Sequence, residues 1–137
     1  MRLTTAARRH GGMRDCPDVQ ATKVLDAAFD VHRELGAGLL ESVYEAAMAI
    51  ALAEQGFKIL RQTEIMATYR GYDLGVGFRA DLIVKDCLLL ELKAVDVLLP
   101  VHLAQVMTYL KMLDIRRGYL LNFNVRLLKE GIKRVSL

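Results

Sequence analysis

Two short apolar runs joined by a polar turn occupy residues 78–93, and they constrain the fold more than any other part of the chain. The first run reads Phe-Arg-Ala-Asp-Leu-Ile-Val, the turn Lys-Asp-Cys, and the second run Leu-Leu-Leu-Glu-Leu-Lys. This pattern predicts a β-hairpin, because each run has the length and residue types of a strand. Besides Arg79 near the start of the first run, three charged residues interrupt the runs: Asp81, Glu91 and Lys93. Charges in buried strands need partners.

The length of the turn decides which of these side chains face each other. A two-residue turn at residues 85–86 would place Asp81 opposite Leu90 and send Glu91 to the other side. A three-residue turn at residues 85–87 would place Asp81 opposite Glu91. We expect the three-residue turn, because it also leaves one apolar set together on the other face: Ala80, Leu82, Val84, Leu88, Leu90 and Leu92.

The charged residues of the hairpin have two interpretations. Facing carboxylates repel unless a cation lies between them, and oxygen ligands suit Mg²⁺ or Mn²⁺. Lys93 shares a strand face with Glu91, so it could hold a water or stabilise negative charge on a phosphate. The alternative is a structural hairpin in which Lys93 simply neutralises Glu91.

The 137 residues suffice for one domain, which we place at residues 18–137 behind a flexible leader of residues 1–17. Residues 1–18 hold four arginines and two aspartates, a net +2 of the chain's +3, so bulk charge gives little support for nucleic-acid binding. No apolar run is long enough to span a membrane and no signal peptide is recognised, which predicts a cytoplasmic protein. The distant Cys16 and Cys87 are expected to be free thiols.

Apolar periodicity predicts three helices and further strands around the hairpin. The first helix runs over residues 18–35 with Asp18 as its N-cap. The sequence Arg70-Gly-Tyr-Asp73 reads as a turn, and Gly75 and Gly77 loosen the start of the hairpin's first strand. No aromatic-interleaved basic stretch is recognised. The other elements are expected as helices at 39–55 and 101–113 and strands at 57–69, 118–124 and 132–137.

Two of these helices carry further candidate residues. Glu41 lies at the edge of a buried stripe, sharing a face with Tyr44; alternatively it only complements the helix dipole. Three polar residues on the helix after Pro100 are three and four positions apart, so they lie in a line along one side of the helix. They are His102, Gln105 and Tyr109, and this side could equally be only the face exposed to solvent.

This order of elements resembles the core of the PD-(D/E)XK nuclease superfamily, an α/β fold with a mixed sheet of about five strands flanked by helices. A closer resemblance is to the GxxExxY family of small bacterial and archaeal proteins, because Gly38-Leu-Leu-Glu41-Ser-Val-Tyr44 matches that pattern. This resemblance covers about residues 20–137. Further matches are Val31-His-Arg-Glu-Leu-Gly36, Gly77-Phe-Arg-Ala-Asp-Leu82, Glu91-Leu-Lys-Ala94, His102 with Ala104-Gln105, Thr108-Tyr-Leu110 and Leu121-Asn-Phe-Asn124.

The resemblance implies a Mg²⁺- or Mn²⁺-dependent nuclease that hydrolyses phosphodiester bonds, with DNA as the expected substrate and a homodimer or accessory protein supplying specificity. The alternative is a catalytically silent nucleic-acid-binding or regulatory module with the same fold. The implied roles are metal carboxylates at Glu41, Asp81 and Glu91, a catalytic lysine at Lys93 and a supporting Gln105, with nucleic-acid contacts from Arg79, His102 and Tyr109.

Overall fold

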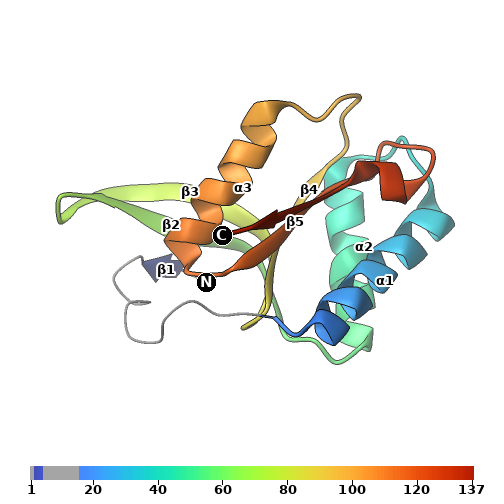
Figure 1. The fold of residues 1–137 in the computed structure, drawn as a ribbon, viewed down its shortest axis with the longest axis horizontal. Helices are drawn as coiled ribbons and strands as arrows, with labels where there is room; N and C mark the ends of the chain where they lie inside the picture. Colours follow the sequence, from blue (N-terminus) through green and yellow to red (C-terminus); the bar gives the residue numbers. More distant parts are fainter. Residues whose placement is uncertain (1, 5–15) are drawn as a thin grey trace.

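A computed structural model describes residues 2–4 and 16–137. In this part of the chain three α-helices and one short 3-10 helix surround a single mixed β-sheet (Figure 1). No described helix is both long and apolar enough to cross a membrane. In chain order the elements are β1 (Arg2–Thr4), α1 (Asp18–Leu35), α2 (Glu41–Glu54), β2 (Ile59–Tyr69), β3 (Tyr72–Val84), β4 (Leu88–Lys93), α3 (Pro100–Leu113), β5 (Arg117–Asn122), η2 (Leu128–Gly131) and β6 (Ile132–Ser136).

The six strands lie in the sheet in the order in which they occur in the chain. Strand β3 is antiparallel to both β2 and β4, and β5 is antiparallel to β6, whereas β1 and β2 run parallel and so do β4 and β5. The predicted mixed sheet flanked by helices is confirmed. One strand comes from the predicted leader, because Arg2–Thr4 pairs along β2; the rest of the leader before Cys16 lies outside the described residues.

The hairpin of β3 and β4 has the register that a three-residue turn predicts. Val84 pairs with Leu88, and the N–H of Cys87 donates to the carbonyl oxygen of Val84 at 3.0 Å. Asp86 in the turn has a φ of 60°. The ladder continues to the pair Leu82 and Leu90 and stops there, so the next opposed residues are Asp81 and Glu91.

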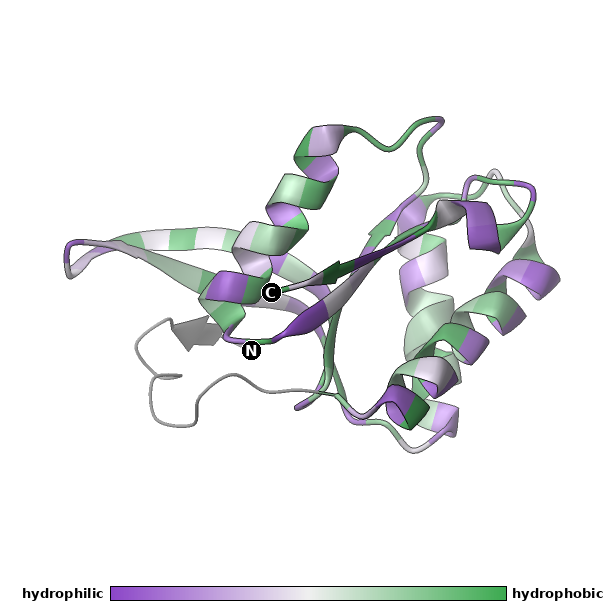
Figure 2. Ribbon diagram, viewed as in Figure 1, coloured by the Kyte–Doolittle hydropathy of each residue, from purple (hydrophilic) through white to green (hydrophobic). Residues whose placement is uncertain are grey.

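Two hydrophobic clusters lie on the two faces of the sheet. Helices α1 and α2 cover one face and α3 covers the other, and in Figure 2 each helix carries both polar and apolar residues, as one-sided burial requires. Five of the six residues predicted to share an apolar face do so, packing against α1 and α2. Ala80 is the exception, because it packs in the cluster on the α3 side with Ile65 and Leu89.

A disulfide joins Cys16, just before α1, to Cys87 in the turn between β3 and β4. Both residues are buried, and 71 positions separate them in the chain. The prediction of free thiols was therefore wrong. It rested on distance in the sequence, which says nothing about two segments that packing brings together.

The outer half of the β2–β3 ribbon extends away from the rest of the molecule (Figure 1). Strands β2 and β3 pair from Ile59 with Val84 as far as Tyr69 with Tyr72, but β4 pairs only with the last three residues of β3. We call residues 67–76 the arm. The arm is a correction to the sequence analysis, which began this strand at residue 78; β3 in fact begins at Tyr72 and accommodates its glycines through register shifts.

Candidate active site

Asp81 and Glu91 lie where the backbone ladder between β3 and β4 ends. The N–H of Asp81 donates to Oε1 of Glu91 at 3.1 Å, and the N–H of Leu92 donates to Oδ2 of Asp81 at 2.9 Å. Side-chain oxygens thus accept the hydrogen bonds that a continuing ladder would have given to carbonyl oxygens. The two strands separate at this point, and the separation holds two carboxylates side by side.

Burial first, and then nearby negative charge, raise the pKa of both carboxyl groups. Burial is the main cause of raising the pKa of Glu91 to about 8, followed by the charge of Asp81, while Lys93 acts in the opposite direction. The pKa of Asp81 is also raised, first by burial and further by the charges of Glu45 and Glu41. Hydrogen bonds to its carboxylate partly offset that rise. A nearby cation would favour the ionised form of both groups.

Gln62 on β2 connects the acidic pair to helix α2. Its side-chain amide donates to Oδ1 of Asp81 at 3.2 Å and also to Oε1 of Glu45, so both of its N–H groups are used. Glu45 in turn accepts a hydrogen bond from Arg61 Nη2 at 3.0 Å. Gln62 has a φ of 48°, a conformation that costs free energy for a residue with a Cβ and that the rest of the structure must hold in place.

A cavity of about 350 Å³ lies between α2 and the strands. Glu41 and Glu45 are four residues apart, so they lie on one side of α2 and both line this cavity. The full lining is Glu41, Ser42, Glu45, Gln62, Asp81 and Leu92. Sequence reasoning missed Glu45, although its spacing from Glu41 was a usable signal. It also missed Gln62, for which there was none, because only the β2–β3 register places Gln62 beside Asp81.

Tyr44, the last residue of the Gly-x-x-Glu-x-x-Tyr pattern, holds the loop before α2. Its hydroxyl donates to the carbonyl oxygen of Gly36 at 2.6 Å and accepts from the N–H of Leu39 at 3.1 Å. Its buried ring stacks on Phe123 with centroids 4.6 Å apart. Gly38, with a φ of 95°, takes a conformation that suits glycine. The pattern therefore sets the start of α2, where Glu41 lies.

The other predicted residues differ in how close they lie to the acidic pair. Lys93 is half-buried on the same strand as Glu91, and its charge lowers the pKa of that carboxyl group. Tyr109 on α3 is close as well, because burial and then the charges of Glu91 and Asp81 raise its pKa. Gln105 is exposed on α3 and is not part of the cavity lining.

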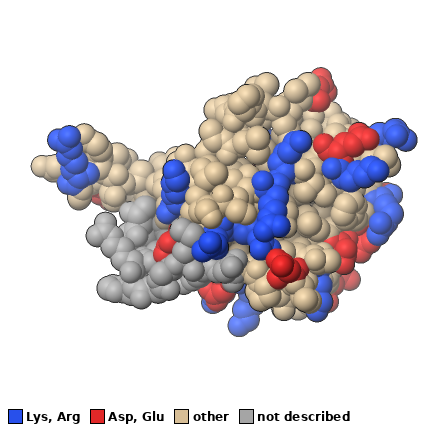
Figure 3. Space-filling model, viewed as in Figure 1, with Lys and Arg blue, Asp and Glu red and all other residues tan. Residues whose placement is uncertain are grey.

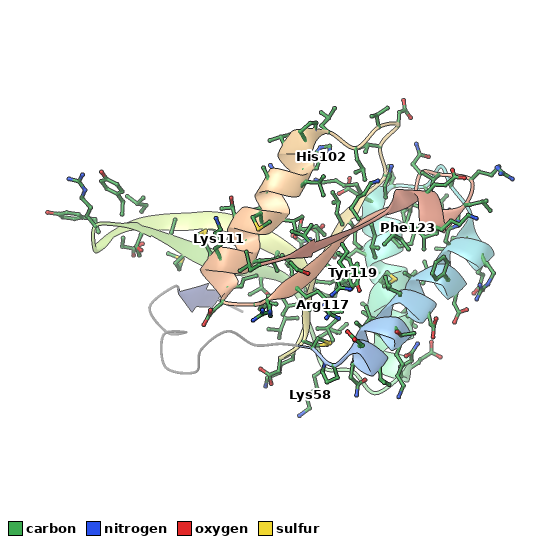
Figure 4. All side chains as sticks on the ribbon, viewed as in Figure 1. Lys58, His102, Lys111, Arg117, Tyr119 and Phe123 are labelled. Atoms are coloured by element: carbon green, nitrogen blue, oxygen red, sulfur yellow. A yellow bond between two sulfur atoms is a disulfide. The ribbon has the colours of Figure 1, made fainter. Side chains whose placement is uncertain are left out.

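Two predicted nucleic-acid contacts have structural surroundings of their own. His102 lies at the start of α3 (Figure 4), where its Nδ1 accepts the N–H of Leu99 at 2.9 Å and so caps the helix. Arg79 is exposed and pairs with Glu64 in the β2–β3 ladder. These positions leave both side chains available at the surface, and their contact with nucleic acid stays a prediction.

The donor atoms of the site fit a hydrated divalent cation. In residues 2–4 and 16–137, no three His, Cys, Asp or Glu side chains lie close enough together to hold a metal ion. Glu41, Asp81 and Glu91 are therefore not assembled as a three-ligand set in this structure. Asp81 and Glu91 are adjacent, and Mg²⁺ commonly takes only one or two carboxylates and keeps several waters. The residues present thus fit the metal that the sequence predicted.

A mixed sheet whose central strands separate at two carboxylates, beside a helix that adds further acids, defines a nuclease-like α/β fold. The family model described as the PD-(D/E)XK nuclease superfamily matches residues 18–135, and the chain belongs to this superfamily. Comparisons with curated proteins and with solved structures gave no significant match.

Proposed function

We propose that this protein is a metal-dependent nuclease that hydrolyses phosphodiester bonds of nucleic acid, with DNA as the first candidate substrate. One observation carries the proposal: Asp81 and Glu91 are held together, partly buried, at a point where both pKa values are raised. Keeping two such acids together costs stability unless a ligand uses them. A Mg²⁺ or Mn²⁺ ion bound by this pair would offset the repulsion.

The surrounding residues would then divide the work of hydrolysis. The metal would supply Lewis acidity at the phosphate and lower the pKa of a water. Lys93 would orient the attacking water or stabilise the negative charge that develops on the phosphate. Gln62 is a positioning residue, because it holds Asp81 against α2. Glu41 would act through a water, and Arg79 would bind a neighbouring phosphate.

We further propose membership of the GxxExxY family, supported by the way Tyr44 and the glycines before it position the first turn of α2. A domain of this size has little room for a separate specificity region. We therefore expect a second copy of the chain or an accessory protein to contribute to substrate choice.

A catalytically silent nucleic-acid-binding module is the second candidate. The observation in its favour is that both oxygens of Asp81 already accept hydrogen bonds, from Leu92 and from Gln62, so the residue also has a structural role between separated strands. A silent module would bind nucleic acid equally well without divalent metal. Metal dependence therefore separates the two candidates.

Calorimetry with Mg²⁺ and Mn²⁺, paired with a panel of plasmid and oligonucleotide substrates, tests the proposal on wild type and Asp81→Asn. Asparagine keeps an oxygen for the Leu92 N–H, whereas alanine would leave that donor unpaired at a cost of about 1–3 kcal/mol. We expect Asp81→Asn to lose both metal binding and metal-dependent cleavage. The control is Asp26→Asn, an exposed aspartate on α1.

Three outcomes of this experiment are informative. Loss of both signals in Asp81→Asn alone establishes the nuclease and leaves only substrate choice. Metal binding without cleavage points to a missing partner or an untried substrate. Metal binding that is equal in wild type and both variants places the ion elsewhere and rejects the Asp81 site.

A further inference from the structure

The end of the arm exposes two tyrosines side by side. Tyr69 and Tyr72 pair in the last position of the β2–β3 ladder, and they are 56% and 73% exposed. Large aromatic rings bury much area when they find a partner, so two adjacent exposed rings form a candidate binding surface. Figure 3 shows basic atoms at the free end of this projection.

The turn between these tyrosines holds them in a defined arrangement. Arg70 and Gly71 have φ values of 50° and 82°, as in the tight two-residue turns that match the twist of a hairpin. The guanidinium carbon of Arg70 lies 5.0 Å from the centroid of the Tyr69 ring, within the range of a cation–π contact. A planar cation and two flat rings are therefore presented together.

Strand β3 connects this surface directly to the acidic pair. Tyr72 and Asp81 are nine residues apart on one strand, which corresponds to about 30 Å or less. Between them on β3, Phe78 stacks on Tyr109 of α3, with centroids 3.7 Å apart. Aromatic rings thus lie at the end of the arm and again between the arm and the acidic pair.

The charge of the arm indicates which form of nucleic acid it suits. The arm, residues 67–76, contains one arginine and one aspartate, so it carries no net charge. Duplex binding depends mainly on neutralising many phosphates, and this surface offers few cations for that. Single-strand binding combines aromatic rings, on which unpaired bases stack, with nearby cations, and the arm presents two exposed tyrosines together with Arg70.

We propose that the arm binds a single-stranded segment flanking the cleavage site, with bases stacked on Tyr69 and Tyr72. This inference rests on the proposed function and extends it to the form of the substrate. At about 3.4 Å per stacked nucleotide, a path of about 30 Å spans about nine nucleotides on one side of the scissile bond. Binding and cleavage should therefore depend on the length of one flank and not of the other.

The first test measures binding of a fluorescent single strand of about twenty nucleotides, long enough to reach from the site past the arm. Substitutions at Tyr72 are made in the Asp81→Asn background with Mg²⁺ present, so that the strand stays intact. We expect Tyr72→Ala and Tyr72→Leu to raise the Kd about tenfold, whereas Tyr72→Phe changes it less than about twofold. The leucine variant keeps an apolar side chain and removes only the flat ring, so it is the matched control.

The second test uses the enzyme with Asp81 intact and shortens one flank of the substrate from about twelve to about three nucleotides. Shortening should raise KM for the wild type and have little effect on Tyr72→Ala, which no longer uses that flank. The change should be in KM and not in kcat, because the arm lies about 30 Å from the reacting atoms.

Several results would overturn the inference. These are equal affinity in all Tyr72 variants, wild-type affinity in Tyr72→Leu, no binding of single strands at all, or a change in molecular mass on substituting Tyr72, which would make a second copy the occupant. The two proposals fail separately. Arm-dependent binding without cleavage in any metal rejects the nuclease and keeps the arm, whereas cleavage with arm-independent affinity rejects the arm and keeps the nuclease.

Discussion

Glu91 couples the stability of the protein to pH and to metal. Its folded-state pKa of about 8 lies above the ordinary 4.5, so the native state without metal holds a proton that the unfolded chain releases between these values. The contribution to stability is therefore fully present below about pH 4.5 and is lost as the pH rises to about 8. The raised pKa of Asp81 acts in the same direction.

We expect the metal-free protein to be less stable at about pH 8 than at about pH 5, by on the order of a few kcal/mol. Glu91→Gln should remove most of that difference, because glutamine carries no titrating proton. Urea denaturation in the presence of a chelator, at both pH values and for both proteins, measures the effect. An identical pH dependence in the variant would show that the carboxyl group is not perturbed as the structure indicates.

Tyr44 provides a second prediction at the scale of a single residue. Tyr44→Phe leaves the Gly36 carbonyl and the Leu39 N–H without their partner, so we expect a loss of about 1–3 kcal/mol in the free energy of unfolding. Metal-dependent cleavage should fall as well, because the loop that sets the start of α2 is loosened. Tyr119→Phe is the control, since it removes the hydroxyl of another buried tyrosine, on β5 and outside this loop. Equal effects of the two substitutions would argue against a special role for the loop.

At the scale of elements, helices and strands follow their local patterns closely. Helix α1 has the predicted bounds, and the other predicted helices and strands agree within about two residues except for β3, whereas β1 and η2 were not predicted. The local prediction failed at the cap: Pro17 is the N-cap of α1, and Asp18 pairs with Arg117 at 3.0 Å. This ion pair joins α1 to β5. The Asp18 side chain therefore makes a long-range contact in place of the helix-capping contact that local propensity predicted.

The disulfide cross-links two elements, because it joins the segment before α1 to the hairpin that carries the acidic pair. Closing a loop of 71 residues corresponds to roughly 4 kcal/mol of stabilisation in the chain-entropy relation. We expect Cys87→Ser to lower the free energy of unfolding by up to that amount. The double variant with Cys16→Ser should add nothing further, because one substitution already removes the bridge.

The disulfide also bears on the predicted cytoplasmic location. Disulfides persist in oxidising compartments and are uncommon in the cytosol, so a stable Cys16–Cys87 disulfide would argue against that location. Intact mass after trapping free thiols with an alkylating reagent in lysed cells shows which state is present. Two alkyl groups per chain would mean that the thiols are reduced in the cell, and denaturation without reductant should then match denaturation with it.

At the scale of the whole molecule, helices cover both faces of the central part of the sheet, and the arm projects beyond them (Figure 1). The proposed second copy would double the mass of 15.4 kDa, and light scattering with and without nucleic acid measures that directly. Because we propose that the arm binds substrate, we expect the dimer to survive substitution of Tyr72. A dimer that dissociates on this substitution would be formed through the arm and would overturn the single-strand inference.

The sequence by itself determined the features that depend on neighbours in the chain. The spacing of apolar residues predicted the helices, and the three-residue turn predicted the strand register that brings Asp81 opposite Glu91. Few registers are acceptable, because side chains alternate between the two faces of a strand and one face must be apolar. Only the tertiary structure decided which distant side chains complete the site. Gln62 reaches Asp81 through a long-range strand pairing, and Cys16 reaches Cys87 through helix packing. No local pattern encodes these contacts, since each depends on where two separately folded segments come to lie.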